Sequence, residues 1–120
     1  MEDVFIIDNA YLNVKRNEIK RDVSYARYKV GNTWYRTAIV SADVLPSGVV
    51  EVTFVIDHTV RGNITVTGVE LYGRSGARIG SRAVSITRAD VVEGVLYVCR
   101  FSLFQVVDSA DNTGAYEAMQ

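Results

Sequence analysis

The sequence predicts an all-β domain built as an antiparallel β-sandwich, immunoglobulin-like or jelly-roll-like in architecture, with a short N-terminal helix as an open alternative. Three observations lead to this prediction. Short runs of β-branched and aromatic residues alternate with polar residues at a period of two. Several of the glycines separate these runs and mark turns between strands. The 120 residues are enough for one hydrophobic core and too few for two, so we expect a single domain over residues 1–107.

The N-terminal stretch fits two structures. A helical spacing relates four apolar residues, Ile7, Ala10, Tyr11 and Val14. The same residues 5–14 also fit two short strands that turn at Asp8-Asn9. We favour the strands and keep a short helix as the alternative.

Residues 22–30 and 33–44 flank Gly31-Asn32, which predicts a β-hairpin. Its arms carry four aromatic residues, Tyr25, Tyr28, Trp34 and Tyr35. Aromatic side chains most often fill the core of such a domain, but on an exposed face they anchor protein interfaces or stack on sugars. We therefore single out Trp34 and Tyr35 as candidate interface residues.

The clearest strand covers residues 49–57. Its alternate apolar residues share one face, Val50, Val52, Phe54 and Ile56. This pattern predicts a half-buried strand with that face in the core. The Pro46-Ser47-Gly48 segment before it predicts a turn, because proline presets φ and glycine tolerates a positive φ.

The next strand, residues 64–72, changes its phase at Gly68. Two apolar pairs lie on either side of the change, Ile64 with Val66 and Val69 with Leu71. An additional residue at a glycine is typical of a β-bulge, which returns the later pair to the inner face.

Three further strands are predicted toward the C-terminus. After a turn at residues 72–76, residues 77–79 and 82–86 predict two short edge strands broken at Gly80. The last strand covers residues 95–107. Apolar groups on both of its faces predict a central strand that is covered on both sides for part of its length.

Residues 108–120 form a polar tail whose sizeable apolar side chains are Tyr116 and Met119. This composition provides too little apolar area to order the tail by itself, because fixing each backbone residue costs about 1–2 kcal/mol. We expect Tyr116 and Met119 to be buried against another molecule. The tail is therefore predicted to be an assembly contact.

Composition argues against several classes of partner. The net charge is −1 and the basic residues are scattered, whereas nucleic-acid binding usually needs a clear basic excess. No segment resembles a signal peptide or a membrane span. We expect neither a nucleic-acid nor a membrane partner. The single cysteine, Cys99, excludes an intrachain disulfide and fits a reducing compartment.

No catalytic, cofactor-binding or metal-binding pattern is found in the sequence. His58, the one histidine, is predicted to lie in a loop between strands. Cys99 lies within an apolar strand, where a free cysteine usually acts as a small hydrophobic group. One histidine and one cysteine are too few for a zinc site. We therefore predict a protein that is not an enzyme and that needs no cofactor or metal.

Three segments, residues 50–57, 64–73 and 93–101, resemble small β-domains of virion structural proteins from tailed bacteriophages. Tail-fibre and baseplate-associated proteins carry such strands, with a turn like the one that follows Leu71-Tyr72-Gly73. The resemblance implies a tail, baseplate, fibre-attachment or capsid-decoration protein. It also implies synthesis in the host cytoplasm, location in the virion, and contacts with other virion proteins and with copies of the same chain.

The sequence therefore predicts a non-catalytic virion subunit that assembles through protein–protein contacts. The alternative is a small glycan-binding β-sandwich module, in which exposed aromatic residues would stack on sugars. Copurification with a large particle would favour the first interpretation, and a monomer that binds oligosaccharide would favour the second.

Overall fold

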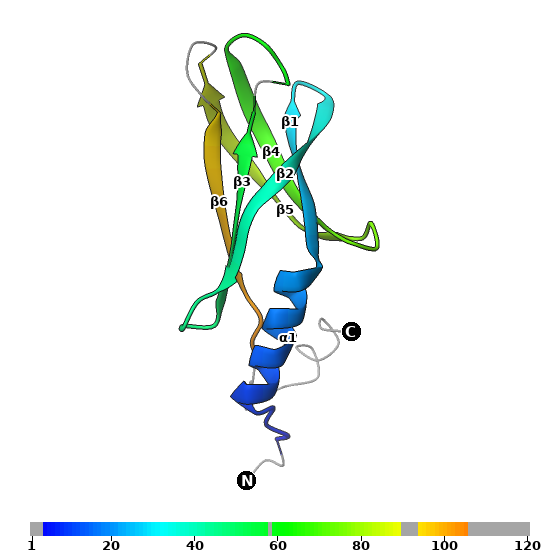
Figure 1. Cartoon of the computed structure of the whole chain (residues 1–120), viewed down its shortest axis with the longest axis vertical. Coiled ribbons are helices and arrows are strands. Elements are labelled where there is room, and N and C mark those ends of the chain that lie inside the picture. The colour runs from blue at the N-terminus through cyan, green and yellow to red at the C-terminus, as the bar shows by residue number, and fades with distance from the viewer. Residues whose placement is uncertain (1–3, 58, 90–93, 106–120) are drawn as a thin grey trace.

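One helix and six strands make up the part of the chain that the computed structural model describes, which comprises residues 4–57, 59–89 and 94–105 (Figure 1). The elements are α1 Asn9–Asp22, β1 Val23–Val30, β2 Thr33–Val44, β3 Val49–Ile56, β4 Ile64–Gly73, β5 Arg78–Arg88 and β6 Val95–Ser102. The strands form one sheet in the order β5-β4-β1-β2-β3-β6. All neighbouring strands are antiparallel.

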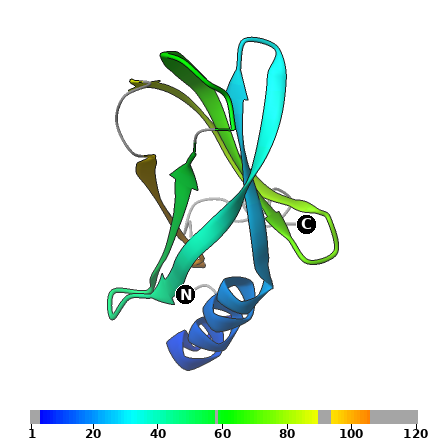
Figure 2. The same ribbon diagram turned by 45° about the horizontal axis from the view of Figure 1, so that its top comes forward.

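The sheet curls until it is nearly barrel-shaped, as the turned view shows (Figure 2). β2 makes the sheet continuous, because residues 33–38 pair with β1 and residues 39–44 pair with β3. This long strand joins β5, β4 and β1 on one side to β3 and β6 on the other, whereas a sandwich would keep two separate sheets. The predicted antiparallel β fold is confirmed, whereas the sandwich is not confirmed.

The core lies inside the curl. The predicted inner face of β3 is confirmed, since its four apolar residues are fully buried, Val50, Val52, Phe54 and Ile56. β1 and β4 provide most of the remaining core, Ala26, Tyr28, Ile64, Val66, Val69 and Leu71. The rings of Phe54 and Tyr97 lie 5.3 Å apart between centroids, so β6 also contributes to the core.

The predicted β-bulge in β4 is confirmed. Gly68 lies opposite Lys29 of β1 and Val66 lies opposite Val30, so Thr67 is the additional residue. The burial pattern of β4 changes phase after this position, as expected for a bulge that returns the apolar residues to the inner face.

The three predicted turns also form, the one near residues 72–76 with a hydrogen bond from the Gly76 N–H to the Gly73 carbonyl oxygen at 3.0 Å. The β1–β2 hairpin turns at Gly31-Asn32, where Gly31 has a φ of 61°. Gly48 has a φ of 90°, and its N–H donates to the carbonyl oxygen of Leu45 at 2.8 Å. A positive φ costs glycine little because it has no Cβ, which explains the glycine at each turn.

The strands predicted over residues 5–14 are wrong, because residues 9–22 form helix α1. The alternative, a helix, is therefore correct. After Val14 the chain continues with charged and amide residues and one β-branched residue, Ile19, a composition that favours helix over strand. The strand prediction was based on residues 5–14 and so did not include these helix-favouring residues.

Two predictions for the C-terminal strands are also wrong. Residues 78–88 form one continuous strand, because Gly80 pairs with Leu71 instead of interrupting the sheet. β6 lies at the end of the sheet instead of its centre, and it stops at Ser102. No layer of the described residues covers its outer apolar side chains, and two of them are therefore exposed, Leu96 at 61% and Val98 at 40%.

Candidate interaction surfaces

Aromatic and basic side chains form a ladder across the outer face of β4, β1 and β2. Tyr25 stacks on Tyr72 with ring centroids 4.9 Å apart and planes 2° apart. Arg36 lies over the same Tyr25 ring, 3.9 Å from its centroid. Arg27 lies between Tyr72, at 4.9 Å, and Trp34, at 5.1 Å. We call these five residues the outer ladder.

Glu70 holds the outer ladder in place. Its nearly buried carboxylate accepts hydrogen bonds from Arg27 at 2.6 Å, from Tyr72 at 2.9 Å and from Arg78 at 3.0 Å. Burial raises the pKa of Glu70, but the bonds from Arg27, Tyr72 and Arg78 outweigh burial and bring the pKa below its ordinary value of 4.5. The carboxylate therefore stays charged and fixes both arginines.

The predicted interface residue Trp34 lies in the outer ladder. Its ring contacts Arg27, and the Lys29 Nζ lies 5.9 Å from the ring centroid. An added Cβ at Gly68 would lie 3.1 Å from the ring, so this glycine makes room for the indole. Both Trp34 and Tyr25 are therefore partly buried rings that already contact cations or another ring.

Tyr35, the second predicted interface residue, lies on the opposite face of β2 from Trp34, as adjacent strand residues do. Its ring stacks on Tyr28 with centroids 5.7 Å apart, and it packs against the core. The structure therefore does not bring Trp34 and Tyr35 together. Tyr116 and Met119 lie outside the described residues.

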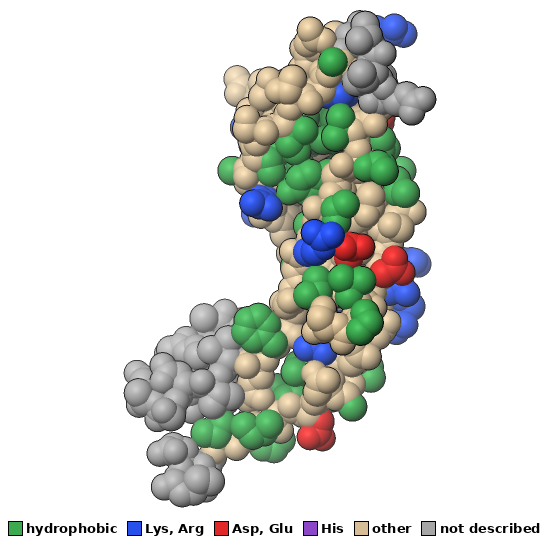
Figure 3. Space-filling model, turned by 90° about the vertical axis from the view of Figure 1, so that its left-hand side faces the viewer, with side chains coloured by type: hydrophobic (Ala, Val, Ile, Leu, Met, Phe, Trp, Pro, Cys, Tyr) green, Lys and Arg blue, Asp and Glu red, His purple; other side chains and the backbone are tan. Residues whose placement is uncertain are grey.

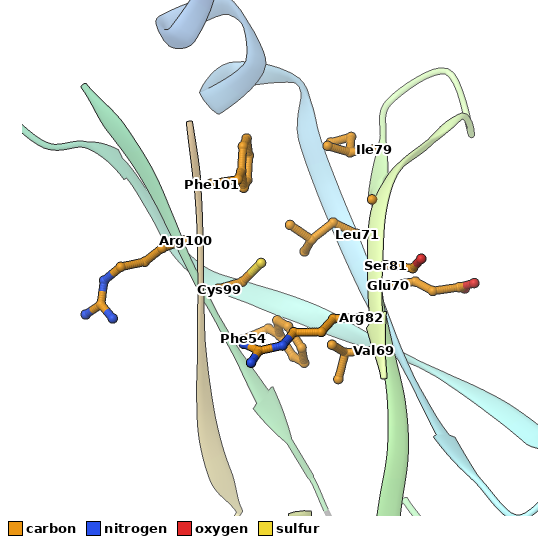
Figure 4. Close-up of a pocket in the computed structure, with 11 residues that line it drawn as sticks. Phe54, Val69, Glu70, Leu71, Ile79, Ser81, Arg82, Cys99, Arg100 and Phe101 are labelled. Carbon is orange, nitrogen blue, oxygen red and sulfur yellow. The ribbon is translucent and has the colours of Figure 1, made fainter. Parts of the chain in front are cut away.

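A groove opens between β5 and β6, the two ends of the curled sheet (Figure 4). In the described residues no backbone pairing joins these strands, so each keeps one unpaired edge. The cavity has a volume of about 270 Å³. Its apolar lining comes from Phe54, Val69, Leu71, Ile79, Cys99 and Phe101. We call it the β5–β6 groove.

Cys99 and Arg82 face this groove from opposite sides (Figure 4). Burial raises the pKa of Cys99 by more than the nearby charge of Arg82 lowers it, so the thiol is less acidic than an ordinary cysteine. Arg82 has no carboxylate partner among the ion pairs of the described residues. By contrast, Arg100 points away from the groove and pairs with Glu51 at 2.8 Å.

Arg16 joins α1 to the segment that follows β6. Its buried side chain donates to the carbonyl oxygen of Leu103 at 2.8 and 3.1 Å, and to Asn9 Oδ1 at 3.2 Å. The Gly48 turn packs against the same guanidinium, since an added Cβ would lie 3.0 Å from its Cζ. One buried arginine therefore holds together the helix, a turn and the end of the sheet.

The chain leaves β6 beside the N-terminal end of α1. The side chain of Gln105 accepts a hydrogen bond from the Ile7 N–H at 2.8 Å and donates one to the Phe5 carbonyl oxygen at 2.7 Å. Large apolar side chains are exposed here, Phe5 at 81%, Ile6 at 63% and Phe104 at 58%. We call Phe5, Ile6 and Phe104 the terminal patch. Hydrophobic side chains are visible at this lower end of the molecule (Figure 3).

A second buried arginine, Arg88, closes the loop after β3. Its guanidinium donates to three backbone carbonyls, those of Asp57, Val60 and Gly62. The Asp57 carboxylate accepts a hydrogen bond from the Tyr28 hydroxyl at 2.8 Å. Burial and this bond raise the pKa of Tyr28 to about 12. Burial also raises the pKa of Asp57, but bonds from Tyr28 and Thr59 and the charge of Arg88 outweigh it, so that pKa is lowered.

Sequence reasoning missed both buried arginines. For Arg88 a signal exists, because Val84, Ile86 and Arg88 alternate on the inner face of β5. For Arg16 none exists, since its burial depends on where β6 ends and on the approach of the Gly48 turn.

The described residues hold no group of three or more His, Cys, Asp or Glu placed to bind a metal ion. None of their helices is long and apolar enough to cross a membrane. His58 lies outside the described residues.

No family model, curated protein or solved structure matches this chain. Its function is therefore inferred from the surfaces described above.

Proposed function

We propose that this chain is a non-catalytic assembly subunit that acts through protein–protein contacts. The β5–β6 groove is the observation that carries this proposal. It combines an apolar lining with two strand edges that no other strand of the described residues pairs with, and edges of this kind accept a strand from another chain. The terminal patch supports the proposal, because clustered exposed apolar side chains mark interaction sites.

Sedimentation of the purified chain tests the assembly function. We expect self-association that weakens in the Phe5→Ser, Ile6→Ser double variant. Val40→Ser is the matched control, since Val40 is an apolar residue of β2 that is 58% exposed and lies outside both surfaces. A chain that stays monomeric at all concentrations and binds no protein of its source would contradict the proposal.

The setting that we propose is the virion of a tailed bacteriophage, in a tail, baseplate, fibre-attachment or capsid-decoration position. Its support is the resemblance of residues 50–57, 64–73 and 93–101 to small virion β-domains. Quantitative mass spectrometry of purified phage particles from the source of this chain tests the setting. A fixed ratio to other virion proteins supports it, and absence from particles while the chain is present in the lysate contradicts it.

A glycan-binding module remains the alternative proposal, with weaker support because cations and rings already contact Tyr25 and Trp34. Saturable binding of an oligosaccharide that is lost in Trp34→Ala would favour it.

A further inference from the structure

We infer that the β5–β6 groove binds residues 106–120 of a second copy of this chain, added as an extended strand to one of the two unpaired edges. The inference depends on the proposed assembly function and names the partner and its binding site. It starts from the groove, where no strand of the described residues covers the core side chains on the inner faces of β3, β4, β5 and β6.

The unpaired edges are the first reason to expect a strand there. A curled sheet that closes into a barrel pairs its first and last strands, whereas β5 and β6 remain apart among the described residues. An extended segment satisfies its own N–H and C=O groups on such an edge, and its alternate side chains enter the cavity.

Residues 106–120 match the groove in chemistry. Within Ala115-Tyr116-Glu117-Ala118, an extended backbone places Tyr116 and Ala118 on one face, so that a large ring beside a small residue faces the apolar lining. The segment carries three acidic residues and no basic one, Asp108, Asp111 and Glu117. Arg82, which crosses the groove without a carboxylate partner among the described residues, provides the complementary charge.

The path of the chain favours a second copy over the same copy. Arg16 holds the Leu103 carbonyl, and Gln105 is bound to the backbone of Phe5 and Ile7. The last described residues therefore lie beside the N-terminal end of α1, where the terminal patch offers apolar contact area to a neighbouring copy.

Arg82 separates this inference from a simpler explanation. In the simpler explanation, the sole role of a charged residue on the inner face of an edge strand is to prevent unwanted strand pairing. If Arg82 had this role alone, its removal would strengthen self-association, and Arg82→Val would associate more tightly than the natural chain. If Arg82 binds the acidic segment, both Arg82→Val and Arg82→Glu weaken association, and Arg82→Glu does so more.

The decisive experiment mixes two full-length variants in analytical ultracentrifugation. Arg82→Glu has an impaired groove and an intact segment 106–120, whereas Tyr116→Ser has an intact groove and an impaired segment. We expect each variant alone to self-associate at least about tenfold more weakly than the natural chain. Mixed, they are expected to form a one-to-one heterodimer through the one intact groove and the one intact segment. Arg61→Glu is the control for an exposed charge reversal outside the groove.

A charge exchange checks the pairing itself. Combining Arg82→Glu with Asp108→Lys, Asp111→Lys and Glu117→Lys should restore association toward the natural level. The reaction rate of Cys99 with a thiol reagent gives a second readout. Cys99 lines the groove, so a docked segment should cover it and slow the reaction.

Three results would overturn the inference. Self-association that both variants leave unchanged would exclude the groove but preserve the assembly function. A monomeric chain in which Tyr116→Ser exposes Cys99 would show that the segment occupies its own groove. A monomeric chain with an equally reactive Cys99 in all variants would show that the groove is not occupied by this segment, and would count against self-assembly as well.

Discussion

The guanidinium of Arg88 donates a hydrogen bond to the backbone carbonyl of Asp57, and this contact ties the end of β5 to the loop after β3. Arg88 is fully buried, and its charge also lowers the pKa of the Asp57 carboxyl. One side chain therefore provides donors for three carbonyl groups of this loop, those of Asp57, Val60 and Gly62. This relationship makes Arg88 a structural residue whose loss should be costly.

Replacing Arg88 by Leu should reduce the free energy of unfolding by about 3–5 kcal/mol, because it leaves three backbone carbonyl groups, those of Asp57, Val60 and Gly62, without their donor. Lys should rescue only part of the loss, since it lacks the planar fork that reaches several acceptors. Urea denaturation measures both effects. Arg82→Leu is the control on the same face of β5, and this exposed position should change the free energy of unfolding by less than about 0.5 kcal/mol. An equal loss in the two variants would contradict the assignment.

Replacing Phe54 by Ala should cost about 3–5 kcal/mol, because the ring is fully buried and its removal leaves a cavity. Thermal or urea unfolding measures the change. Val55→Ala, at the next position on the outer face of β3, is the matched control and should cost much less. A cost for Phe54→Ala below about 1 kcal/mol would show that the inner face of β3 is assigned wrongly.

Acid should remove the stability that Glu70 contributes. The pKa of Glu70 in the folded chain is lowered, so its contribution is fully present above the ordinary pKa of 4.5 and is lost as the pH falls through the lower folded value. Glu70→Gln should therefore lower stability at neutral pH and flatten the fall in stability at acid pH. Unfolding measured from neutral to acid pH checks this. Glu51→Gln, a more exposed partner of Arg100, should change the profile much less.

Alkaline pH should act through Tyr28. Its folded pKa is raised to about 12 from an ordinary value of 10.0, so its contribution is present below the ordinary value and is lost as the pH rises toward 12. Tyr28→Phe should lose this part of the alkaline fall in stability. Tyrosinate absorbance during an alkaline titration, compared between the natural chain and Tyr28→Phe, measures the difference. Ionisation of every tyrosine near the ordinary value in the folded chain would contradict the buried contact with Asp57.

Several local features of the strands could be predicted from the sequence. Period-two alternation identified the buried face of β3, and the change of phase at Gly68 identified the bulge in β4. Turn glycines located the β1–β2 hairpin and the turn before β3. These features depend on neighbouring residues along one strand, so the local pattern contains the information that they need.

Tertiary structure alone decided how the strands are arranged. Apolar residues on both faces of β6 suggested a central strand, yet β6 is an end strand, because alternation reports which side chains are apolar and not which layer covers them. The order of the strands in the curled sheet, which leaves the groove between β5 and β6, depends on pairings between distant segments, β1 with β4 and β3 with β6. The burial of Arg16 and Arg88 has the same origin, since their acceptors are carbonyl groups that only the folded backbone brings within reach.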